Sequence, residues 1–448
     1  MYQRHRCARP TRLIWAISGA FALFLHPAVA AAQRVFPFDF PGLEIGVADN
    51  EAGPTGVTVF HFTRPVEGAI DVRGGAPGSM NTDALRAVAD DRALDAVVFA
   101  GGSSYGLEAA AGVQDALGAR TDGFNWTNIP FVVGSIIYDL GYRRFNAVTP
   151  DAALGRTALA EAKPGAFPLG AVGAGRFANT GGYFGRSTYS GQGAGMRQSG
   201  PTKVLVFSVV NAFGAIVDRG GNVARCPGPS PDNCGLIKDW IANYIGRLPA
   251  AAPKAAARAL THNTTITLVV TNQKLPYWQL QRLAIQVHTS MARAIQPFST
   301  ADDGDTLYAV TDSTVENPAL SSEDLGTLAS EAAWDAVLSS RPDVDPAPEQ
   351  GPPLNAAQMQ SVVGRYGLGP DQIFNVGVDG GRLWVEGPAA PNPYLPSRKR
   401  TALEPINGSL FRIAGPRGDR IAFEISGGKV TRVIINPGHW PVQAVRID

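Results

Sequence analysis

The chain has 448 residues, with 39 Lys and Arg against 38 Asp and Glu and a formal net charge of +1. Hydrophobic residues make up 45% and charged residues 17%, a composition that excludes a disordered chain and allows two or three globular domains at roughly 150 residues each. The balanced charge, without a cluster of Lys or Arg, argues against nucleic-acid binding and favours a small-molecule partner.

Residues 1–30 have the pattern of a cleavable signal peptide. Four arginines among the first 12 residues precede an apolar stretch, Leu13–Leu25, which is too short to cross a bilayer. Ala28-Val29-Ala30 is a small-residue cleavage motif. We therefore expect the mature chain to begin near Ala31, to be periplasmic or secreted, and to keep no stable membrane anchor.

The mature chain divides by composition into two domains. Residues 34–338 alternate strand-like and helix-like patterns, as α/β domains do. A polar, Pro-rich linker, residues 339–354, follows. Residues 355–448 predict a small all-β domain, a barrel or sandwich, from the runs Phe374–Val378, Arg382–Val385, Ser409–Ile413, Arg420–Ile425 and Lys429–Ile435. This tail resembles the lipocalin-like β domains of some exported serine hydrolases, so we expect a barrel with a recognition or packing role.

A first candidate nucleophile lies in a glycine-rich turn. Gly102-Ser103-Ser104-Tyr105-Gly106 matches G-x-S-x-G between a buried strand, Leu94–Ala100, and a helix that opens at Leu107. An α/β-hydrolase would place Ser104 there with Asp and His partners. The four His of the mature chain suit that role poorly, and the alternative is a turn whose glycines allow close backbone approach. Those His residues are His61, His262, His288 and His439.

Two cysteines remain in the mature chain, because Cys7 leaves with the signal peptide. Cys226 and Cys234 flank a stretch rich in Pro, Gly and Asn, and an oxidising compartment permits a disulfide that closes this small loop. A metal pair is the alternative, but no His or further Cys stands nearby. The chain also lacks an HExxH motif, so we expect no metal and no cofactor.

A second candidate nucleophile is Thr264, which begins an alternating strand after a polar stretch. Cleavage before Thr264 would leave a free α-amine beside its hydroxyl. Such an amine has a pKa of about 7.7–8.0 and acts as a base at neutral pH without a His. A helix opened by Pro276 and a turn with Asp303 and Asp305 follow, and this unit can return both carboxylates to the head of the strand. By itself an Asp-rich turn is more typical of a solvated turn or a calcium loop, although the EF-hand pattern fails here.

Nine short motifs follow one another through about residues 38–312: Pro41–Gly46, Gly56–Val59, Asp71–Gly78, Ala100–Leu107, Ile137–Gly141, Val172–Gly175, Val210–Gly214, Asn263–Ile266 and Asp303–Thr306. In this order they resemble the L-aminopeptidase/D-esterase family. That family includes β-peptidyl aminopeptidases and nylon-oligomer (6-aminohexanoate oligomer) hydrolases and is structurally akin to ornithine acetyltransferases. The resemblance favours Thr264 over Ser104.

The resemblance implies an αββα four-layer sandwich that cleaves itself between Asn263 and Thr264. The fragments, residues 31–263 and 264–448, would stay together and assemble as a homo-oligomer. Thr264 matches the nucleophile that forms an acyl-enzyme with a small peptide or amide substrate. The other matches are the acidic pair Asp303 and Asp305, the oxyanion-hole donor Asn211, the pocket hydroxyl of Tyr138, and a pocket wall made by Gly102, Ser103 and Ser104.

Two departures from the family pattern bear on the mechanism. Relatives carry a Lys where this chain has Gly182. If that Lys assists proton transfer, Arg176 or Arg186 would have to replace it, and a guanidinium stays charged. Strict aminopeptidases carry a Glu near the Tyr-Asp motif that pairs with the substrate amine, whereas Ser135-Ile136-Ile137 offers no carboxylate here.

We therefore expect an exported aminopeptidase or amide hydrolase that acts on peptides, amino-acid amides or esters through Thr264. An endo-type oligoamide hydrolase and an acyltransferase would use the same chemistry and are alternatives. A non-catalytic binding protein and an α/β-hydrolase that uses Ser104 are less favoured.

Overall fold

The computed structural model describes residues 33–51, 53–86, 93–120, 129–140, 148–226, 233–248, 263–341 and 354–447, the last range with gaps at 370–371, 390–391, 393, 396–397, 415–418 and 437–441. The expected signal peptide lies outside these ranges, and so do residues 342–353 of the expected linker. His262 and His439 are outside them as well.

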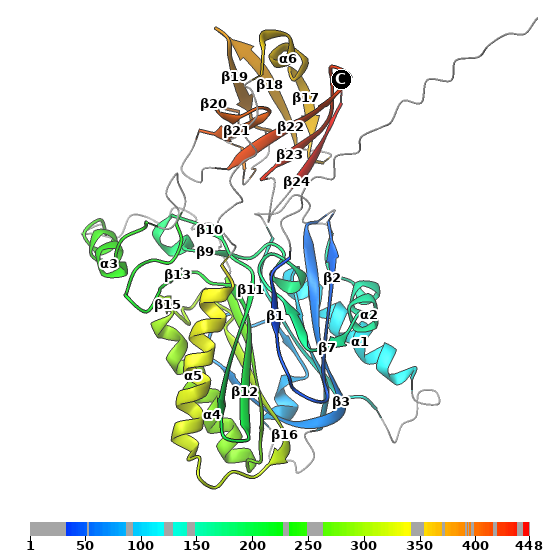
Figure 1. The fold of residues 1–448 in the computed structure, drawn as a ribbon, viewed down its shortest axis with the longest axis vertical. Coiled ribbons are helices and arrows are strands. Elements are labelled where there is room, and N and C mark those ends of the chain that lie inside the picture. Colours follow the sequence, from blue (N-terminus) through cyan, green and yellow to red (C-terminus); the bar gives the residue numbers. More distant parts are fainter. Residues whose placement is uncertain are drawn as a thin grey trace, which may run out of the picture. The chain divides into compact units, whose positions relative to one another are not determined.

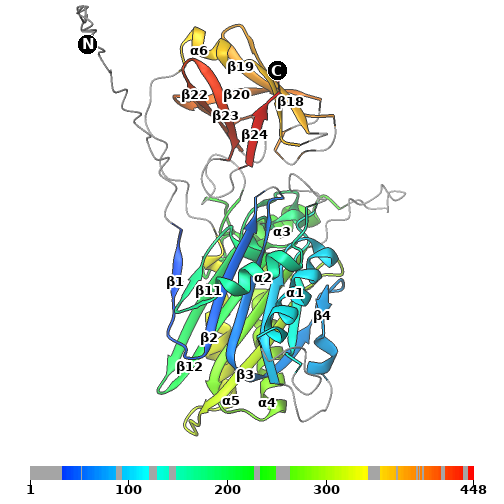
Figure 2. The same cartoon turned by 90° about the vertical axis from the view of Figure 1, so that its right-hand side faces the viewer.

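The large domain is built on one ten-stranded hydrogen-bonded sheet that folds into two facing halves (Figures 1 and 2). The long strand β3 (Thr55–Val72) belongs to both halves, because its first part pairs with β5 and its last residues, 67–72, pair with β16. The first half continues through β16 (Thr306–Val315), β14 (Thr264–Gln273), β12 (Thr202–Asn211) and β11 (Gln192–Ser199). The second contains β2 (Leu43–Asn50), β5 (Ala93–Ala100), β6 (Val132–Ile136) and β4 (Ser79–Met80), with β7 (Lys163–Pro164) beside β2.

Helices cover the outer face of each half. Helices α4 (Tyr277–Ser290) and α5 (Ser322–Ser339) pack on the first half, and α1 (Leu107–Gly118) and α2 (Ala152–Ala160) pack on the second (Figure 1). Three short antiparallel two-stranded sheets lie outside the main sheet: β1 (Val35–Pro37) with β8 (Ala166–Pro168), β9 (Asn179–Thr180) with β10 (Thr188–Tyr189), and β13 (Ala215–Ile216) with β15 (Ile295–Gln296). This helix–sheet–sheet–helix order confirms the predicted αββα sandwich.

The space between the two half-sheets is filled by aromatic and aliphatic side chains. Phe60 of the second half packs against Phe207 of the first with ring centroids 5.2 Å apart. Leu268 and Tyr308 are fully buried in the same cluster, and each such side chain contributes about 1.5–3 kcal/mol of transfer free energy. Side chains alternate between the two faces of a strand, so every second residue of β14, counted from Leu268, points into this space. Thr264 is one of these residues.

The C-terminal part, residues 364–446, is a closed barrel of eight antiparallel strands, which confirms the predicted β barrel. Its interior is filled by its own side chains, with Tyr366, Phe374 and Phe423 fully buried, as expected for eight strands. A short helix, α6 (Ala356–Ser361), precedes it. The strands are β17 (Gly364–Gly367), β18 (Ile373–Asp379), β19 (Arg382–Glu386), β20 (Arg400–Asn407), β21 (Leu410–Ile413), β22 (Arg420–Ser426), β23 (Lys429–Ile435) and β24 (Val442–Arg446).

Candidate active site

Thr264 begins β14 and lies beside the last residue of β12. In the antiparallel pairing of these strands, Thr264 is directly opposite Asn211. Both are 2% exposed. Each lies on the same face of its strand as the residues that fill the space between the half-sheets. Directly opposite side chains on one face of a sheet are neighbours. The structure therefore brings the predicted nucleophile and the predicted oxyanion-hole donor together.

Two hydrogen-bond donors converge on the carbonyl oxygen of Asn263, in the peptide bond before Thr264. The Oγ1 hydroxyl of Thr264 donates to it at 2.6 Å, and the backbone N–H of Gly304 donates at 2.8 Å. The backbone of Asn263 also bridges to Asp303. The hydroxyl is thus held beside the carbonyl group that it would attack, and a backbone donor already polarises that carbonyl.

Gly304 approaches Thr264 so closely that a side chain would not fit. A Cβ atom at this position would lie 2.6 Å from Oγ1 of Thr264 and 2.7 Å from the carbonyl oxygen of Ala76. The segment around Ala76 also contacts the loop that carries Asp303 and Asp305. The N–H of Ala76 donates to the carbonyl of Asp303 at 2.8 Å. The N–H of Arg73 donates to the carbonyl of Asp305 at 3.1 Å. The backbone of the loop is therefore fixed on both sides of Gly304.

Asp303 and Asp305 are held mostly by backbone donors. Asp305 accepts the N–H of Thr265 at 2.6 Å on one oxygen and the N–H of Ser299 at 3.0 Å on the other. Asp303 accepts the N–H and hydroxyl of Thr300 at 2.9 and 2.7 Å. The strand–helix–turn unit therefore does return both carboxylates to the head of β14.

Burial raises the pKa of both carboxyl groups. Asp305 is fully buried, and burial together with the charge of Asp303 raises its pKa to about 8. Burial also raises the pKa of Asp303, against the opposing effect of the donors from Thr300. Because burial and the charge of Asp303 both disfavour the ionised form of Asp305, a pKa of about 8 leaves a proton on this carboxyl group near neutral pH.

The side chain of Asn211 is oriented by two backbone groups. Its Oδ1 accepts the N–H of Asn179 at 2.9 Å, and its Nδ2 donates to the carbonyl of Tyr138 at 2.9 Å. A carboxamide nitrogen carries two hydrogens, so one remains for a developing oxyanion. Tyr138 is half-buried just after β6, and its backbone rather than its hydroxyl makes this contact.

Three residues of this site were not singled out in the sequence. Gly304 and Asp139 lie within the Asp303–Thr306 and Ile137–Gly141 motifs, so the motifs themselves carried a signal for them. Asp139 accepts the Thr55 hydroxyl and the N–H of Gly102, both at 2.8 Å. It thereby holds the glycine-rich turn. Asn179 lies in no motif and contacts Asn211 only through tertiary folding.

The glycine-rich turn gives no sign of a serine nucleophile. Ser104 is exposed, Ser103 has a φ of 56°, and Gly102 has a φ of 82°. Of the two His that the structure describes, Nδ1 of His61 pairs with Glu44 at 3.0 Å and that of His288 pairs with Asp71 at 2.9 Å. The N–H of Ser103 donates to Ile137 at 3.0 Å, which places the turn beside the Tyr138 segment. A pocket-wall role for Gly102, Ser103 and Ser104 stays a prediction.

The arginines that could replace the family lysine are engaged elsewhere. The buried guanidinium of Arg176 pairs with both carboxylate oxygens of Glu51 at 2.8 Å. The guanidinium of Arg186 lies over the ring of Trp240, 4.7 Å from its centroid. A Cβ added at Gly182 would meet Phe213 at 3.5 Å, an ordinary contact, so this position has room for a Cβ atom.

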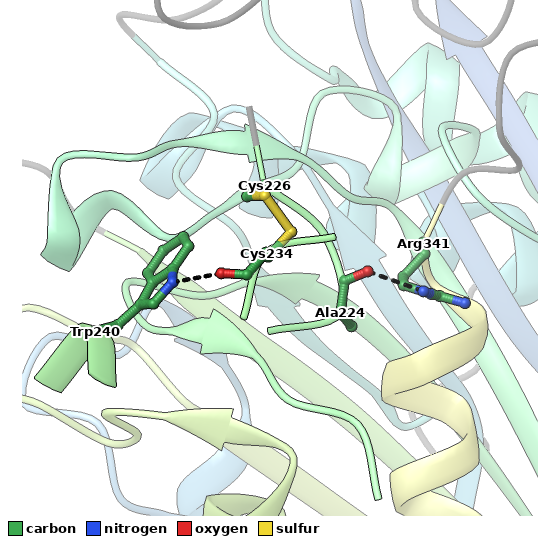
Figure 3. Close-up of a disulfide and its surroundings, with 5 residues drawn as sticks. All are labelled: Ala224, Cys226, Cys234, Trp240 and Arg341. Carbon is green, nitrogen blue, oxygen red and sulfur yellow. Dashed lines mark hydrogen bonds between the residues drawn. A yellow bond between two sulfur atoms is a disulfide. The ribbon is translucent and has the colours of Figure 1, made fainter. Parts of the chain in front are cut away.

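Cys226 and Cys234 form a disulfide, with their Cα atoms 5.7 Å apart (Figure 3). The indole Nε1 of Trp240, in α3 (Ile237–Ile245), donates to the carbonyl of Cys234 at 2.9 Å. Arg341 donates to the carbonyl of Ala224 at 2.9 Å. The disulfide therefore lies between a contact to α3, made by Cys234, and a contact to the residue Arg341 after α5, made by Ala224 just before Cys226.

In the part of the chain that the structure describes, no helix is long and apolar enough to cross a membrane. No group of three or more His, Cys, Asp or Glu residues there could hold a metal ion.

The model of peptidase family S58 matches residues 38–341. A 6-aminohexanoate-oligomer endohydrolase of Paenarthrobacter ureafaciens is 40% identical over 336 residues, which cover 72% of this chain and 90% of that protein. An uncharacterized aminopeptidase of Mycobacterium tuberculosis is 34% identical over 278 residues, which cover 59% of this chain and 75% of that protein.

Among solved structures, a β-aminopeptidase of Burkholderia sp. has 17% identity and a TM-score of 0.48, and covers 69% of this chain and 89% of its own. The L-aminopeptidase D-Ala-esterase/amidase of Ochrobactrum anthropi has 17% identity and a TM-score of 0.46, with 68% and 86% covered. On the family model and the 40% identical relative, the chain belongs to peptidase family S58 and is a hydrolase that acts on amide bonds.

Proposed function

We propose that the chain cleaves its own Asn263–Thr264 bond and that Thr264 then serves as the amino-terminal nucleophile of an amide hydrolase. The observation that carries this proposal is the convergence of the Thr264 hydroxyl and the Gly304 N–H on the Asn263 carbonyl oxygen, at 2.6 and 2.8 Å.

Self-cleavage would proceed by an N-to-O acyl shift. Oγ1 of Thr264 attacks the carbonyl carbon of Asn263, and the Gly304 N–H stabilises the oxyanion that forms. Breaking the C–N bond gives an ester, as the Thr264 nitrogen gains the proton that Oγ1 loses. Water then hydrolyses the ester and leaves a carboxyl group on Asn263 and a free amine on Thr264.

Turnover would reuse the same hydroxyl on a substrate amide. The α-amine of Thr264, with an ordinary pKa of about 7.7–8.0, takes the hydroxyl proton and later passes it to the leaving amine. The second hydrogen of the Asn211 carboxamide is available for the oxyanion, a donor typically worth about 3–4 kcal/mol of barrier. The acidic pair lies at the head of the same strand and would stabilise the ammonium form. Water then releases the acyl group from Oγ1.

An endo-acting oligoamide hydrolase is the second candidate, and one observation favours it over a strict aminopeptidase. The residues before Tyr138 offer no carboxylate for a substrate ammonium: Ser135 bonds to the hydroxyl of Tyr308 at 2.7 Å, and Ile136 and Ile137 are buried. The relative from Paenarthrobacter ureafaciens is named for endo-hydrolysis of 6-aminohexanoate oligomers. We infer that a free amino terminus is not required of the substrate. Transfer of the acyl group to an added amine is the alternative outcome.

We also propose export to the periplasm or beyond. Residues 1–30 have a signal-peptide pattern, and the Cys226–Cys234 disulfide suits an oxidising compartment.

The test is amino-terminal sequencing and intact mass of the purified protein. We expect two fragments, residues 31–263 and 264–448, with Thr264 as a new amino terminus. Thr264→Ala should abolish cleavage and turnover, whereas Ser104→Ala, in the exposed turn, should preserve both. A single intact chain that hydrolyses amides at full rate would contradict the proposal.

A further inference from the structure

Four consecutive backbone N–H groups, those of residues 73–76, donate to the loop that carries the acidic pair. The first two donate to the carbonyl of Asp305 at 3.1 and 3.2 Å, and the other two donate to the carbonyls of Thr300 and Asp303 at 3.1 and 2.8 Å. A Cβ added at Gly74 would lie 2.2 Å from the backbone nitrogen of Asp305, so the two backbones are in direct contact. We call residues 73–76 the donor segment. The position of Asp305 depends on where this segment lies.

The donor segment begins two residues after Asp71, at the end of β3, and two side chains hold the carboxylate of Asp71. Nδ1 of His288, in the last turn of α4, lies 2.9 Å from Oδ2 of Asp71. Nε of Arg73 donates to the same oxygen at 2.5 Å. Asp71 is paired with Leu307 of β16, which belongs to the cluster buried under α4 and α5. His288 therefore joins α4 to the residues that lead into the donor segment.

The bond between His288 and Asp71 links a neutral ring to a charged carboxylate. Burial opposes ionisation of Asp71, but hydrogen bonds from His288 and Arg73 hold the pKa of its carboxyl group below the ordinary value. Burial lowers the pKa of His288, against the opposing effect of Asp71. The ring is therefore neutral near pH 7, and its one proton lies on Nδ1, the nitrogen that faces an acceptor.

This bond is the only polar contact that offsets the burial of the His288 ring among the described residues. His288 is 1% exposed, and no described residue forms a hydrogen bond with its Nε2. A polar ring costs free energy to bury unless it is hydrogen-bonded. The histidine at this position is therefore explained by what it does to Asp71.

His288 also contacts the segment that holds Asp305 from another direction. Its ring packs edge-on against Phe298, with centroids 5.5 Å apart. The next residue, Ser299, donates its N–H and its hydroxyl to Oδ2 of Asp305 at 3.0 and 3.2 Å. One buried side chain thus touches both the segment that leads to the Asp305 carbonyl and the segment that holds the Asp305 carboxylate.

We propose that His288 is a positioning residue for Asp305, which it acts on through its hydrogen bond to Asp71 and its ring contact with Phe298. This inference rests on the proposed function, in which the acidic pair stabilises the ammonium form of the Thr264 amine. His288 touches neither substrate nor amine and transfers no proton. Its effect is on distance, and a displacement on the order of 1 Å near reacting groups can lower a rate by about a hundredfold.

The first experiment separates kcat from KM with a p-nitroanilide substrate that the wild-type protein cleaves. His288→Phe keeps a ring against Phe298 and removes the donor to Asp71, so kcat should fall at least tenfold. KM should stay within about twofold, because the acidic pair acts on the Thr264 amine and not on the substrate. His288→Asn returns an N–H donor close to the position of Nδ1 and should have a kcat at least threefold above that of His288→Phe.

Asp71→Asn is the milder second variant, for use where His288→Phe does not fold. It keeps an acceptor for both donors but removes the charge, which roughly halves the strength of such bonds. Its kcat should fall by roughly threefold.

His61→Phe is the matched control, because His61 is the other described His that pairs with a carboxylate. Its Nδ1 lies 3.0 Å from Glu44, and its side chain is 13% exposed. This pair joins β2 to β3 at positions far from the donor segment. His61→Phe should lower thermal stability and leave kcat unchanged, as expected for a pair that only stabilises the fold. A folded His288→Phe protein with wild-type kcat would overturn the proposal.

A second experiment needs neither cleavage nor turnover. The full-length Thr264→Ala protein is labelled with 13C at the aspartate carboxyl groups and titrated by NMR, and Asp305→Asn identifies the Asp305 signal. His288→Phe should move the Asp305 midpoint upward from about 8 by roughly one pH unit, because weaker donors stabilise the charged form less. His61→Phe should leave it in place. If the protein proves inactive while this midpoint moves, the function proposal fails and the positioning role stands. An unchanged midpoint in His288→Phe would overturn the positioning role, whatever the activity.

Discussion

Gly304→Ala is the substitution that best isolates the self-cleavage geometry. Gly304 donates its N–H to the Asn263 carbonyl at 2.8 Å, and its φ lies outside the left-handed region. Alanine can therefore adopt the backbone conformation, but its Cβ would lie 2.6 Å from Oγ1 of Thr264 and 2.7 Å from the carbonyl oxygen of Ala76. The backbone at Ala76 is tied to Asp303 and cannot retreat without losing that bond.

Two effects of different size follow. Relieving the overlap costs about 1–3 kcal/mol of folding free energy, the usual range for overpacking a buried site. Moving the N–H away from the Asn263 carbonyl removes an oxyanion donor, typically worth about 10²–10³ in rate. Cleavage should therefore slow by roughly two to three orders of magnitude, while the folded state loses only a small part of its stability.

The assay follows the intact chain and its two fragments with time by gel and mass spectrometry, and thermal unfolding is measured on the same samples. Gly182→Ala is the matched control: its added Cβ would meet Phe213 at 3.5 Å and Ser187 at 3.6 Å, both ordinary contacts, so cleavage should be unchanged. If folded Gly304→Ala cleaves at the wild-type rate, the Gly304 N–H does not stabilise the cleavage transition state and the reasoning fails.

Four further outcomes are expected. Thr264→Ser keeps a hydroxyl beside the Asn263 carbonyl and should retain cleavage, whereas Thr264→Ala should not; fragment mass decides this. Asp303→Asn should lower kcat by at least tenfold, with Asp302→Asn as the neighbouring control, and a wild-type rate would reduce Asp303 to turn formation. Gly182→Lys restores the family cation where a Cβ has room and should accelerate cleavage in a time course. The uncleaved Thr264→Ala protein should lose thermal stability as the pH rises from about 4 to about 8. Over this range folded Asp305, with a pKa of about 8, keeps a proton that the unfolded chain has released. Adding Asp305→Asn, which cannot ionise, should make the melting temperature depend less on pH.

Local patterns were sufficient to locate the elements that carry the candidate site. Alternating β-branched residues predict the strand from Thr264, which the structure gives as Thr264–Gln273, and Pro276 with 3.6-residue periodicity predicts the helix observed at Tyr277–Ser290. The predicted runs Arg382–Val385 and Lys429–Ile435 match strands of the barrel to within a residue. These elements are specified by neighbours along the chain, and for that reason their sequences reveal them.

What the sequence could not show depends on contacts between distant residues. Asn179 orients Asn211 across 32 positions, and the donation of the Gly304 N–H to the Asn263 carbonyl depends on how two segments fold together, which the Asp303–Thr306 motif does not specify. Barrel strand β20 carries Pro405 and two charged residues, Arg400 and Glu404, within Arg400–Asn407, so its pattern resembles a turn. It becomes a strand because β19 and β21 pair with it on both sides.

The acidic pair links the two stages of the proposed mechanism. In the uncleaved chain, Asp303 and Asp305 are occupied by donors from Thr265, Ser299, Thr300 and Phe213, and burial keeps a proton on the pair. Among the described residues, none of the groups that donate to the pair is a cation, and before cleavage the nitrogen of Thr264 is a neutral amide. Cleavage converts that nitrogen into an amine, and a cationic amine beside the pair would lower both carboxyl pKa values and allow them to ionise. Cleavage would therefore create the amine base and also the charged form of the carboxylates that stabilises its ammonium form. On this proposal, turnover would require cleavage even though the hydroxyl, Asn211 and the acidic pair are already in position.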